Sequence, residues 1–186
     1  MRLKIARLCC VLCIALLAMT AQGAPAAPPA PLDPFLAQLT GDWDLMGTLG
    51  KKPVHYRGTG RWVLKQAWLC LTLNDLATNG YQASVYLGHD EPAGDYIAHW
   101  LDQFGAAGAR VVGSGRRDGQ TLVLQFPYAE GAFRDTLTLS EDGNTGSLLL
   151  ESQEKDGRWT RFASYRMTRL HHLPSPAGAG ASRDSQ

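Results

Sequence analysis

Histidine is the residue type in this chain best suited to catalysis or metal binding, and the sequence contains five, His55, His89, His99, His171 and His172. His99 alternates with Ile97 and Leu101 along a run that is typical of a β-strand. If that face of the strand lines a cavity, the imidazole of His99 can ligate a heme iron. A structural histidine held by hydrogen bonds would give the same pattern, so the sequence predicts no cofactor and leaves heme as the alternative.

His89 stands next to Asp90, and such a pair can exchange protons as a general acid and base. The same pair, followed by the Pro- and Gly-containing loop at residues 91–94, can equally fix a turn. A hydrolase or isomerase that uses His89 or His99 is therefore one alternative. Residues 24–186 contain no serine-nucleophile elbow, zinc-protease motif, phosphate loop or dinucleotide fingerprint. We therefore assign no catalytic residue and no metal ligand, and expect binding rather than catalysis.

The first 23 residues have the organisation of a secretory signal peptide. A basic start with Arg2, Lys4 and Arg7 is followed by an apolar run at residues 8–19 and then by small residues. The run is about 12 residues long, whereas a membrane-spanning helix needs roughly 20. We predict cleavage after Gly23, export to the periplasm or the medium, and no stable membrane insertion of the mature chain. An uncleaved N-terminal anchor is the alternative.

Three of the four cysteines fall inside this predicted signal peptide. The remaining one, Cys70, has no partner for an internal disulfide, so the mature domain must be stabilised by its core. Leu69 and Leu71 flank Cys70 and favour a buried, inert thiol.

The composition divides the remaining chain into three parts. Residues 24–32 are rich in Pro and Ala and predict an extended linker, and residues 171–186 lack an apolar pattern and predict a disordered tail. Residues 33–170 are the predicted folded domain. With 18 basic and 17 acidic residues, the chain lacks the strongly basic surface of nucleic-acid-binding proteins. The sequence leaves the oligomeric state open.

A helix of about two turns is predicted at the start of the domain, because Asp33 can cap it and Pro34 suits its first position. The rest of the domain indicates strands separated by tight turns, several of them at Asn-Gly or Asp-Gly dipeptides that accept positive φ. The predicted strands are residues 43–49, 54–64, 68–74, 81–89, 95–101, 109–116, 120–126, 133–140, 147–153 and 158–169.

Alternation along these strands indicates one apolar and one polar face. Ala83, Val85 and Leu87, for example, share a face. In residues 158–169 neither face is apolar, which a strand facing a partly polar interior or lying at a sheet edge would explain. An open meander would leave two unpaired edges, and closure removes them. The sequence therefore predicts an all-β fold, an antiparallel up-and-down meander of about 8–10 strands closed into a barrel.

Gly41-Asp42-Trp43 opens the first strand directly after the helix, and Arg169 stands near the end of the last strand. These residues resemble the signature of lipocalin-like (calycin) barrels. The resemblance implies that Trp43 plugs the closed end of the barrel. It also implies that Arg169 packs across the indole of Trp43, a contact stabilised by cation–π attraction.

A second resemblance covers the middle of the chain. Gly88-His89-Asp90, Tyr96 and Trp100-Leu101-Asp102 are similar to the Gly-Tyr-Asp…Tyr…Trp-x-Asp pattern of a family of lipocalin-like bacterial proteins of unknown function. His89 stands where that pattern has Tyr. With the stretch at residues 56–64, the match spans about residues 35–169. This resemblance implies the fold and no established activity.

The chain has five Trp residues, and aromatic side chains inside a barrel can line a pocket for an apolar ligand. Small residues on the strands predict incomplete filling of the interior; they are Gly58, Gly60, Ala83, Ala98, Gly113 and Gly115. The candidate ligand-binding residues are Trp62, Tyr86, Tyr96, His99 and Trp100. We predict an exported barrel that binds a small apolar or amphipathic molecule without covalent chemistry. A structural barrel with a filled interior is the alternative.

Overall fold

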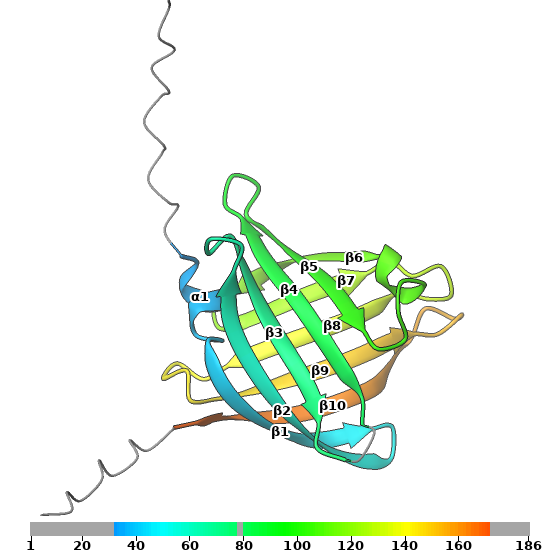
Figure 1. Cartoon of the computed structure of the whole chain (residues 1–186). Helices are drawn as coiled ribbons and strands as arrows, with labels where there is room; N and C mark the ends of the chain where they lie inside the picture. The colour runs from blue at the N-terminus through cyan, green and yellow to red at the C-terminus, as the bar shows by residue number, and fades with distance from the viewer. Residues whose placement is uncertain (1–31, 78–79, 172–186) are drawn as a thin grey trace, which may run out of the picture. The chain divides into compact units, whose positions relative to one another are not determined.

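Ten antiparallel strands form a closed barrel in the computed structural model of the chain (Figure 1). The structure describes residues 32–77 and 80–171. Each strand pairs with its neighbours in the sequence, and β1 (Gly41–Leu49) pairs with β10 (Trp159–Leu170) to close the barrel. This confirms the predicted all-β meander. The predicted signal peptide, nearly all of the predicted linker and tail, and Asn79 lie outside the described residues.

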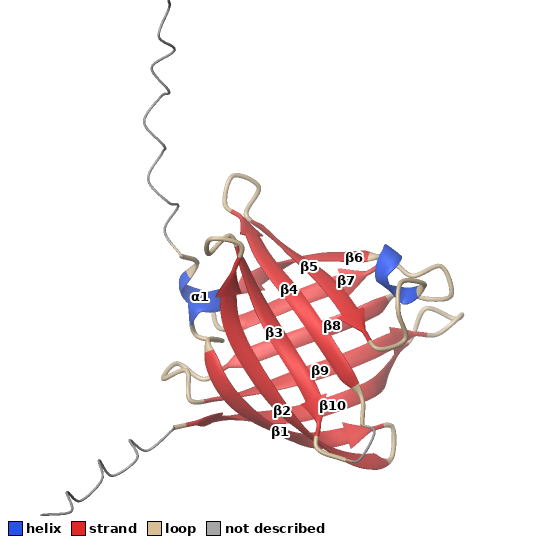
Figure 2. Ribbon diagram, in the orientation of Figure 1, coloured by secondary structure: helices blue, strands red, loops and turns tan. Residues whose placement is uncertain are grey.

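Strands dominate the described barrel, and helix is confined to two short segments (Figure 2). Besides β1 and β10, the elements in chain order are α1 (Pro34–Ala37), β2 (Lys52–Val63), β3 (Trp68–Asp75), β4 (Gln82–Asp90), β5 (Asp95–Asp102), the 3₁₀ turn η1 (Gly108–Arg110), β6 (Val112–Asp118), β7 (Thr121–Phe126), β8 (Phe133–Leu139) and β9 (Thr145–Gln153). All ten predicted strands are present. The predicted helix is shorter than expected, and the strand predicted from Ala109 starts at Val112 because η1 precedes it.

The tight turns use glycine where the backbone requires it. Gly119 and Gly143, which belong to predicted Asp-Gly turns, have φ angles of 54° and 65°. In this left-handed region a side chain is strained, so glycine is favoured. These short hairpins keep consecutive strands adjacent and so produce the meander.

The α1 segment covers one end of the barrel. Its first turn is capped by Asp33, whose Oδ1 accepts a hydrogen bond from the Leu36 N–H at 2.8 Å. Phe35, Leu36 and Leu39 are buried in the core. A Cβ at Gly60 would lie 1.9 Å from the Leu39 carbonyl oxygen. Glycine at position 60 therefore lets the segment after α1 lie directly against β2.

Trp43 is fully buried at this covered end, and the guanidinium carbon of Arg169 lies 4.3 Å from its ring centroid. The Nε–H of Arg169 donates to the Gly143 carbonyl at 2.9 Å. Its two terminal nitrogens donate to the carbonyls of Gln38 and Thr40. This is the arrangement that the lipocalin-like resemblance implies for Trp43 and Arg169.

The last strand contains a β-bulge that exchanges its two faces. Arg161 pairs with Glu151 and Ala163 pairs with Leu150, so Phe162 is the extra residue. Before the bulge Trp159 faces outward, and after it Ala163, Tyr165 and Met167 are buried. The bulge therefore accounts for the mixed pattern of this strand, and the expectation of a sheet edge is wrong because β10 is paired on both sides.

Three of the six small residues on the strands do not leave the expected empty space, because neighbouring atoms occupy it. A Cβ at Gly58 would lie 2.8 Å from the Leu45 side chain, and one at Gly113 would lie 2.6 Å from the Phe126 ring. At Gly60 the backbone of Leu39 and Thr40 occupies this space instead of a side chain. The prediction that these positions leave the interior incompletely filled is wrong for Gly58, Gly60 and Gly113.

Candidate functional site

The barrel is hollow at the end away from α1. A cavity of about 550 Å³ opens there; β1 begins beside α1 and its last residue, Leu49, lines the cavity. Leucine and phenylalanine side chains form most of the wall, together with Trp100 and four tyrosines. The side chains packed under α1, among them Trp43 and Leu39, fill the other end. The interior is therefore filled at one end and open at the other.

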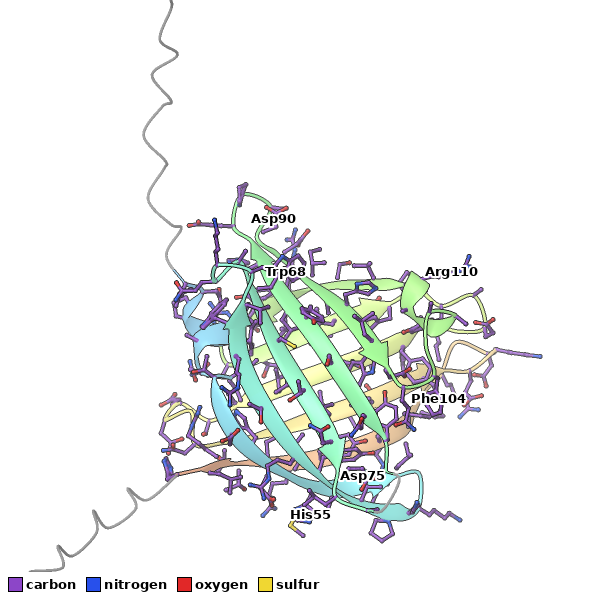
Figure 3. All side chains as sticks on the ribbon, in the orientation of Figure 1. His55, Trp68, Asp75, Asp90, Phe104 and Arg110 are labelled. Carbon is purple, nitrogen blue, oxygen red and sulfur yellow. The ribbon has the colours of Figure 1, made fainter. Side chains whose placement is uncertain are left out.

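Exposed apolar side chains stand at the rim of this cavity. Phe104, in the loop after β5, is 76% exposed (Figure 3). Phe162, the extra residue of the β10 bulge, is 43% exposed and also lines the cavity. Asp90 lies at the opposite end of the barrel (Figure 3). A molecule entering the cavity would cover the two phenylalanines.

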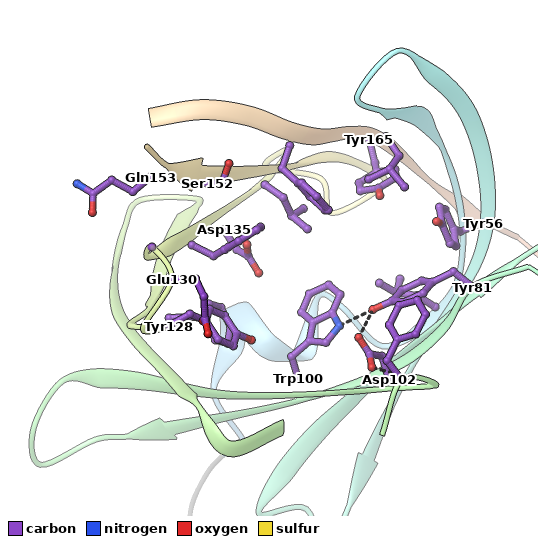
Figure 4. A pocket seen from close by; sticks show the side chains of 18 of the residues that line it. Tyr56, Tyr81, Trp100, Asp102, Tyr128, Glu130, Asp135, Ser152, Gln153 and Tyr165 are labelled. Atoms are coloured by element: carbon purple, nitrogen blue, oxygen red, sulfur yellow. Dashed lines mark hydrogen bonds between the residues drawn. The ribbon is translucent and has the colours of Figure 1, made fainter. Parts of the chain in front are cut away.

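A chain of hydrogen bonds fixes one wall of the cavity (Figure 4). The Trp100 Nε1–H donates to the Tyr81 hydroxyl at 2.8 Å, and that hydroxyl donates to Asp102 Oδ2 at 3.0 Å. Asp102 Oδ1 accepts from the Phe104 N–H at 3.0 Å, which ties the wall to the rim. Burial raises the pKa of Tyr81 well above its ordinary value, so this hydroxyl stays protonated.

Two further tyrosines extend this wall, since the Tyr56 ring meets the Tyr81 ring edge to face with the centroids 6.3 Å apart. The rings of Tyr56 and Tyr165 meet edge to face with their centroids 5.5 Å apart. Burial raises the pKa of both hydroxyl groups. Tyr81, Tyr56 and Tyr165 therefore form one continuous group of neutral phenols in the cavity wall.

Asp135 is the least expected residue of the cavity. It lies in β8 on the inward face between Phe133 and Leu137, opposite Leu124 and Leu150 of the adjacent strands, and is only 6% exposed. No group among the described residues forms a hydrogen bond or ion pair with its carboxyl. In Figure 4 this carboxyl points into the cavity. Burial raises the pKa of Asp135 to about 7.

The ionisable lining of the cavity is entirely acidic or phenolic. It contains three carboxyls, from Asp102, Glu130 and Asp135, and no lysine, arginine or histidine among the described residues. The described part of the chain holds no cluster of three His, Cys, Asp or Glu residues suited to a metal ion.

Only Trp100, of the five candidate ligand-binding residues, lines this cavity. Tyr86 and His99 lie opposite each other in the β4–β5 register, on the outer face of the barrel. Tyr86 also lies across from Cys70, which is buried as predicted. His99 Nε2 is 2.7 Å from the Ala109 carbonyl oxygen and so attaches η1 to β5. The interpretation of His99 as a heme ligand inside the barrel is therefore wrong, because its side chain is on the outward face.

Tyr96 and Trp62 share the inward face but lie at the end covered by α1. The Tyr96 hydroxyl donates to Asp33 Oδ2 at 2.8 Å, and His89 Nδ1 is 3.1 Å from the same oxygen. The His89 and Tyr96 rings stack with centroids 4.4 Å apart. His89 therefore pairs with Asp33 and not with Asp90, and its contacts hold the α1 cap. Trp62 is half-buried against the core.

Most residues that line the cavity are not among the predicted ligand-binding residues, including Tyr56, Tyr81, Tyr165 and Asp135. One signal was available. Asp135 stands between Phe133 and Leu137 on the face of its strand that is otherwise apolar, where a charged residue is unexpected. The tyrosines gave no comparable signal, because aromatic residues are common at any position of a strand.

Comparison with known proteins bears on the fold. No family model matches the chain. No curated protein matches it. Among solved structures, the chain is similar to the crystal structure of Rv2717c from M. tuberculosis, with a TM-score of 0.52 and 17% sequence identity over 76% of this chain and 100% of that chain. At this identity the likeness shows the barrel fold alone. Within the described residues, no helix has the length and apolar character needed to cross a membrane.

Proposed function

We propose that this protein is an exported lipocalin-like barrel that binds a small apolar or amphipathic molecule without covalent chemistry. The open cavity carries the proposal. Its volume of about 550 Å³ lies within the roughly 300–1,000 Å³ of small-molecule pockets. Its wall is mainly aliphatic and aromatic, with a few polar groups that can orient a ligand.

The apolar rim supports binding as the role of the cavity. Covering Phe104 and Phe162 would remove exposed apolar surface from water, at about 25 cal/mol per Å². Trp100 and Tyr81 are already held by their hydrogen bonds, so they would lose little conformational freedom when a ligand binds.

Binding is favoured over catalysis by the positions of the two candidate histidines. His89 contacts Asp33 at the end covered by α1, and His99 contacts Ala109 on the outer face. Neither can reach a molecule in the cavity. Tyr81 and Asp102, which do line it, are already hydrogen-bonded to each other.

We extend the proposal to the family and the compartment. The chain resembles the bacterial lipocalin-like family with the Gly-Tyr-Asp…Tyr…Trp-x-Asp pattern, and the positions Tyr96, Trp100 and Asp102 each form hydrogen bonds inside the barrel. The basic and apolar start of the chain supports export. The intact mass of the exported protein should correspond to a chain that starts at Ala24. A full-length species confined to the membrane fraction would contradict this.

The binding proposal is tested with a neutral hydrophobic dye. Nile red should give a saturable fluorescence increase with the purified protein, and native mass spectrometry should detect a co-purified small molecule. Trp100→Leu removes part of the cavity wall and should weaken dye binding several-fold. Trp159→Leu is the matched control, because Trp159 lies on the outer face under the Arg134 guanidinium at 4.4 Å. No co-purified molecule and no saturable dye signal would overturn the proposal.

A further inference from the structure

The cavity has an uneven charge distribution that restricts what can bind there. Of its three carboxyls, Asp102 already accepts hydrogen bonds from Tyr81 and Phe104, and Glu130 is exposed at the rim. Asp135 alone is buried without a partner among the described residues. A buried carboxylate without a counter-charge is costly, since the apolar surroundings replace water with nothing equivalent.

The groups that face Asp135 cannot supply this counter-charge. The adjacent strands β7 and β9 present Leu124 and Leu150. The nearby titratable groups are the phenols of Tyr128 and Tyr165, whose pKa values burial raises and the carboxyl of Asp135 raises further. The other ionisable groups of the lining are Tyr56, Tyr81, Asp102 and Glu130. All of these groups are neutral or acidic.

Aromatic rings surround the same region. Tyr128 stacks with Phe126 at 6.2 Å and meets Phe133 edge to face at 5.8 Å. Phe126 of β7 and Phe133 of β8 are partners in the β7–β8 register, and Phe133 lies two positions before Asp135. Faces of aromatic rings attract cations and give nothing comparable to anions. An anionic ligand would therefore meet three carboxyls and the negative faces of the rings.

We propose that the cavity selects an amphipathic organic cation, a molecule whose apolar body fills the cavity while its protonated amine pairs with Asp135. This inference rests on the proposed binding function and narrows the class of its ligand. The ammonium group would donate charge-assisted hydrogen bonds to the carboxylate, and the apolar body of the ligand would displace water from the cavity around them. A fatty acid would be the disfavoured ligand of the same size.

The test compares three probes with one alkyl chain and different head groups. Isothermal titration at pH 8 uses decylamine, decan-1-ol and decanoate below their aggregation limits. Decylamine should bind at least about tenfold more tightly than decan-1-ol, because a hydrogen bond to a charged group changes the affinity by about a factor of 10 to 100. Decanoate should bind most weakly, because the carboxyls of the cavity repel it. Asp135→Asn should weaken decylamine binding by about that factor. Decan-1-ol binding within about threefold of the parent protein would show that the cavity of the variant is intact.

A control variant and a measurement of proton release identify the carboxyl that pairs with the amine of decylamine. Asp95→Asn removes a carboxyl that pairs with Arg116 at 2.8 Å on the exposed surface, and it should leave decylamine affinity unchanged. Because burial raises the pKa of Asp135 to about 7, this carboxyl is mainly protonated at pH 6. Decylamine binding at pH 6 should therefore release about one proton, and at pH 8.5 nearly none. Asp135→Asn should abolish the release.

The outcomes separate this inference from the binding proposal. Equal or tighter binding of decan-1-ol or decanoate would overturn the cation inference, as would undiminished decylamine binding to Asp135→Asn. Saturable Nile red binding without any decylamine preference would overturn the inference and leave the binding proposal standing. Failure of all three probes and of Nile red would overturn both.

Discussion

Trp43 and Arg169 are direct partners in the register between β1 and β10, so the strand pairing that closes the barrel also places the guanidinium on the indole. The same guanidinium donates to backbone carbonyls on both sides of the covered end, at Gly143 and at Gln38 and Thr40. One side chain thus joins the last strand, the segment after α1 and the β8–β9 turn.

Arg169→Ala should destabilise the protein by about 1–3 kcal/mol, because packing is lost and three carbonyls lose their donor. Arg169→Lys should recover only part of this, since an ammonium lacks the planar fork of the guanidinium. Urea midpoints measure the effect, with Arg166→Ala, at an exposed position of β10, as the control. An unchanged midpoint for Arg169→Ala would remove the structural role assigned to this residue.

Asp135 should make the protein less stable as the pH rises. Burial raises the pKa of Asp135 to about 7 in the folded state, whereas its ordinary value is 3.8. Between these values the folded state holds the proton and the unfolded state does not, so stability falls as the pH increases from about 4 to about 7. At pH 8 Asp135→Asn should exceed the parent protein in stability by on the order of 4 kcal/mol at most, at 1.36 kcal/mol per pKa unit.

The measurement is the difference between the unfolding free energies of Asp135→Asn and the parent protein from pH 4.5 to 8.5. Groups that titrate equally in both proteins cancel in this difference. The exposed Asp95→Asn variant should give a flat difference over the same range. If the difference in unfolding free energy for Asp135→Asn were also independent of pH, the Asp135 carboxyl would have to be solvated or paired in the folded protein.

Gly60→Ala should destabilise the end covered by α1. Its new Cβ would lie 1.9 Å from the Leu39 carbonyl oxygen, which also accepts the Trp43 indole N–H at 3.0 Å. The backbone has to move, and overpacking of this kind costs about 1–3 kcal/mol or more. Gly108→Ala is the control, since no atom lies within 4 Å of its added Cβ. Equal thermal midpoints for the two variants would contradict the close approach at Gly60.

Tyr96→Phe should loosen the α1 cap without affecting the cavity. It removes the hydroxyl that donates to Asp33 and accepts from the Arg117 Nε–H at 3.2 Å. The expected cost is about 1–2 kcal/mol, because both partners are left partly unsatisfied. Hydrogen exchange of the Leu36 amide, which Asp33 caps, should become faster. Weaker Nile red binding to this variant, with unchanged hydrogen exchange of the Leu36 amide, would place Tyr96 at the binding site instead.

The sequence alone determined the positions of the strands and their order as a meander. Alternation with period two indicates strands such as Gln82–Asp90, and Asp-Gly turns indicate several of the hairpins, and both signals are local. Closure followed from the cost of unpaired edges. The resemblance around Trp43 and Arg169 identified a contact between the two ends of the domain.

Only the tertiary structure decided which side chains meet in the cavity. His99 and Trp100 are neighbours in the sequence, yet one lies on the outer face and the other lines the cavity, because adjacent residues of a strand point to opposite sides. The bulge at Phe162 then exchanges the inward and outward faces within β10, and no local sequence pattern predicts this exchange. Asp135 became a candidate for recognition only once the barrel enclosed it, since its isolation and its raised pKa arise from residues of other strands that remove water from it.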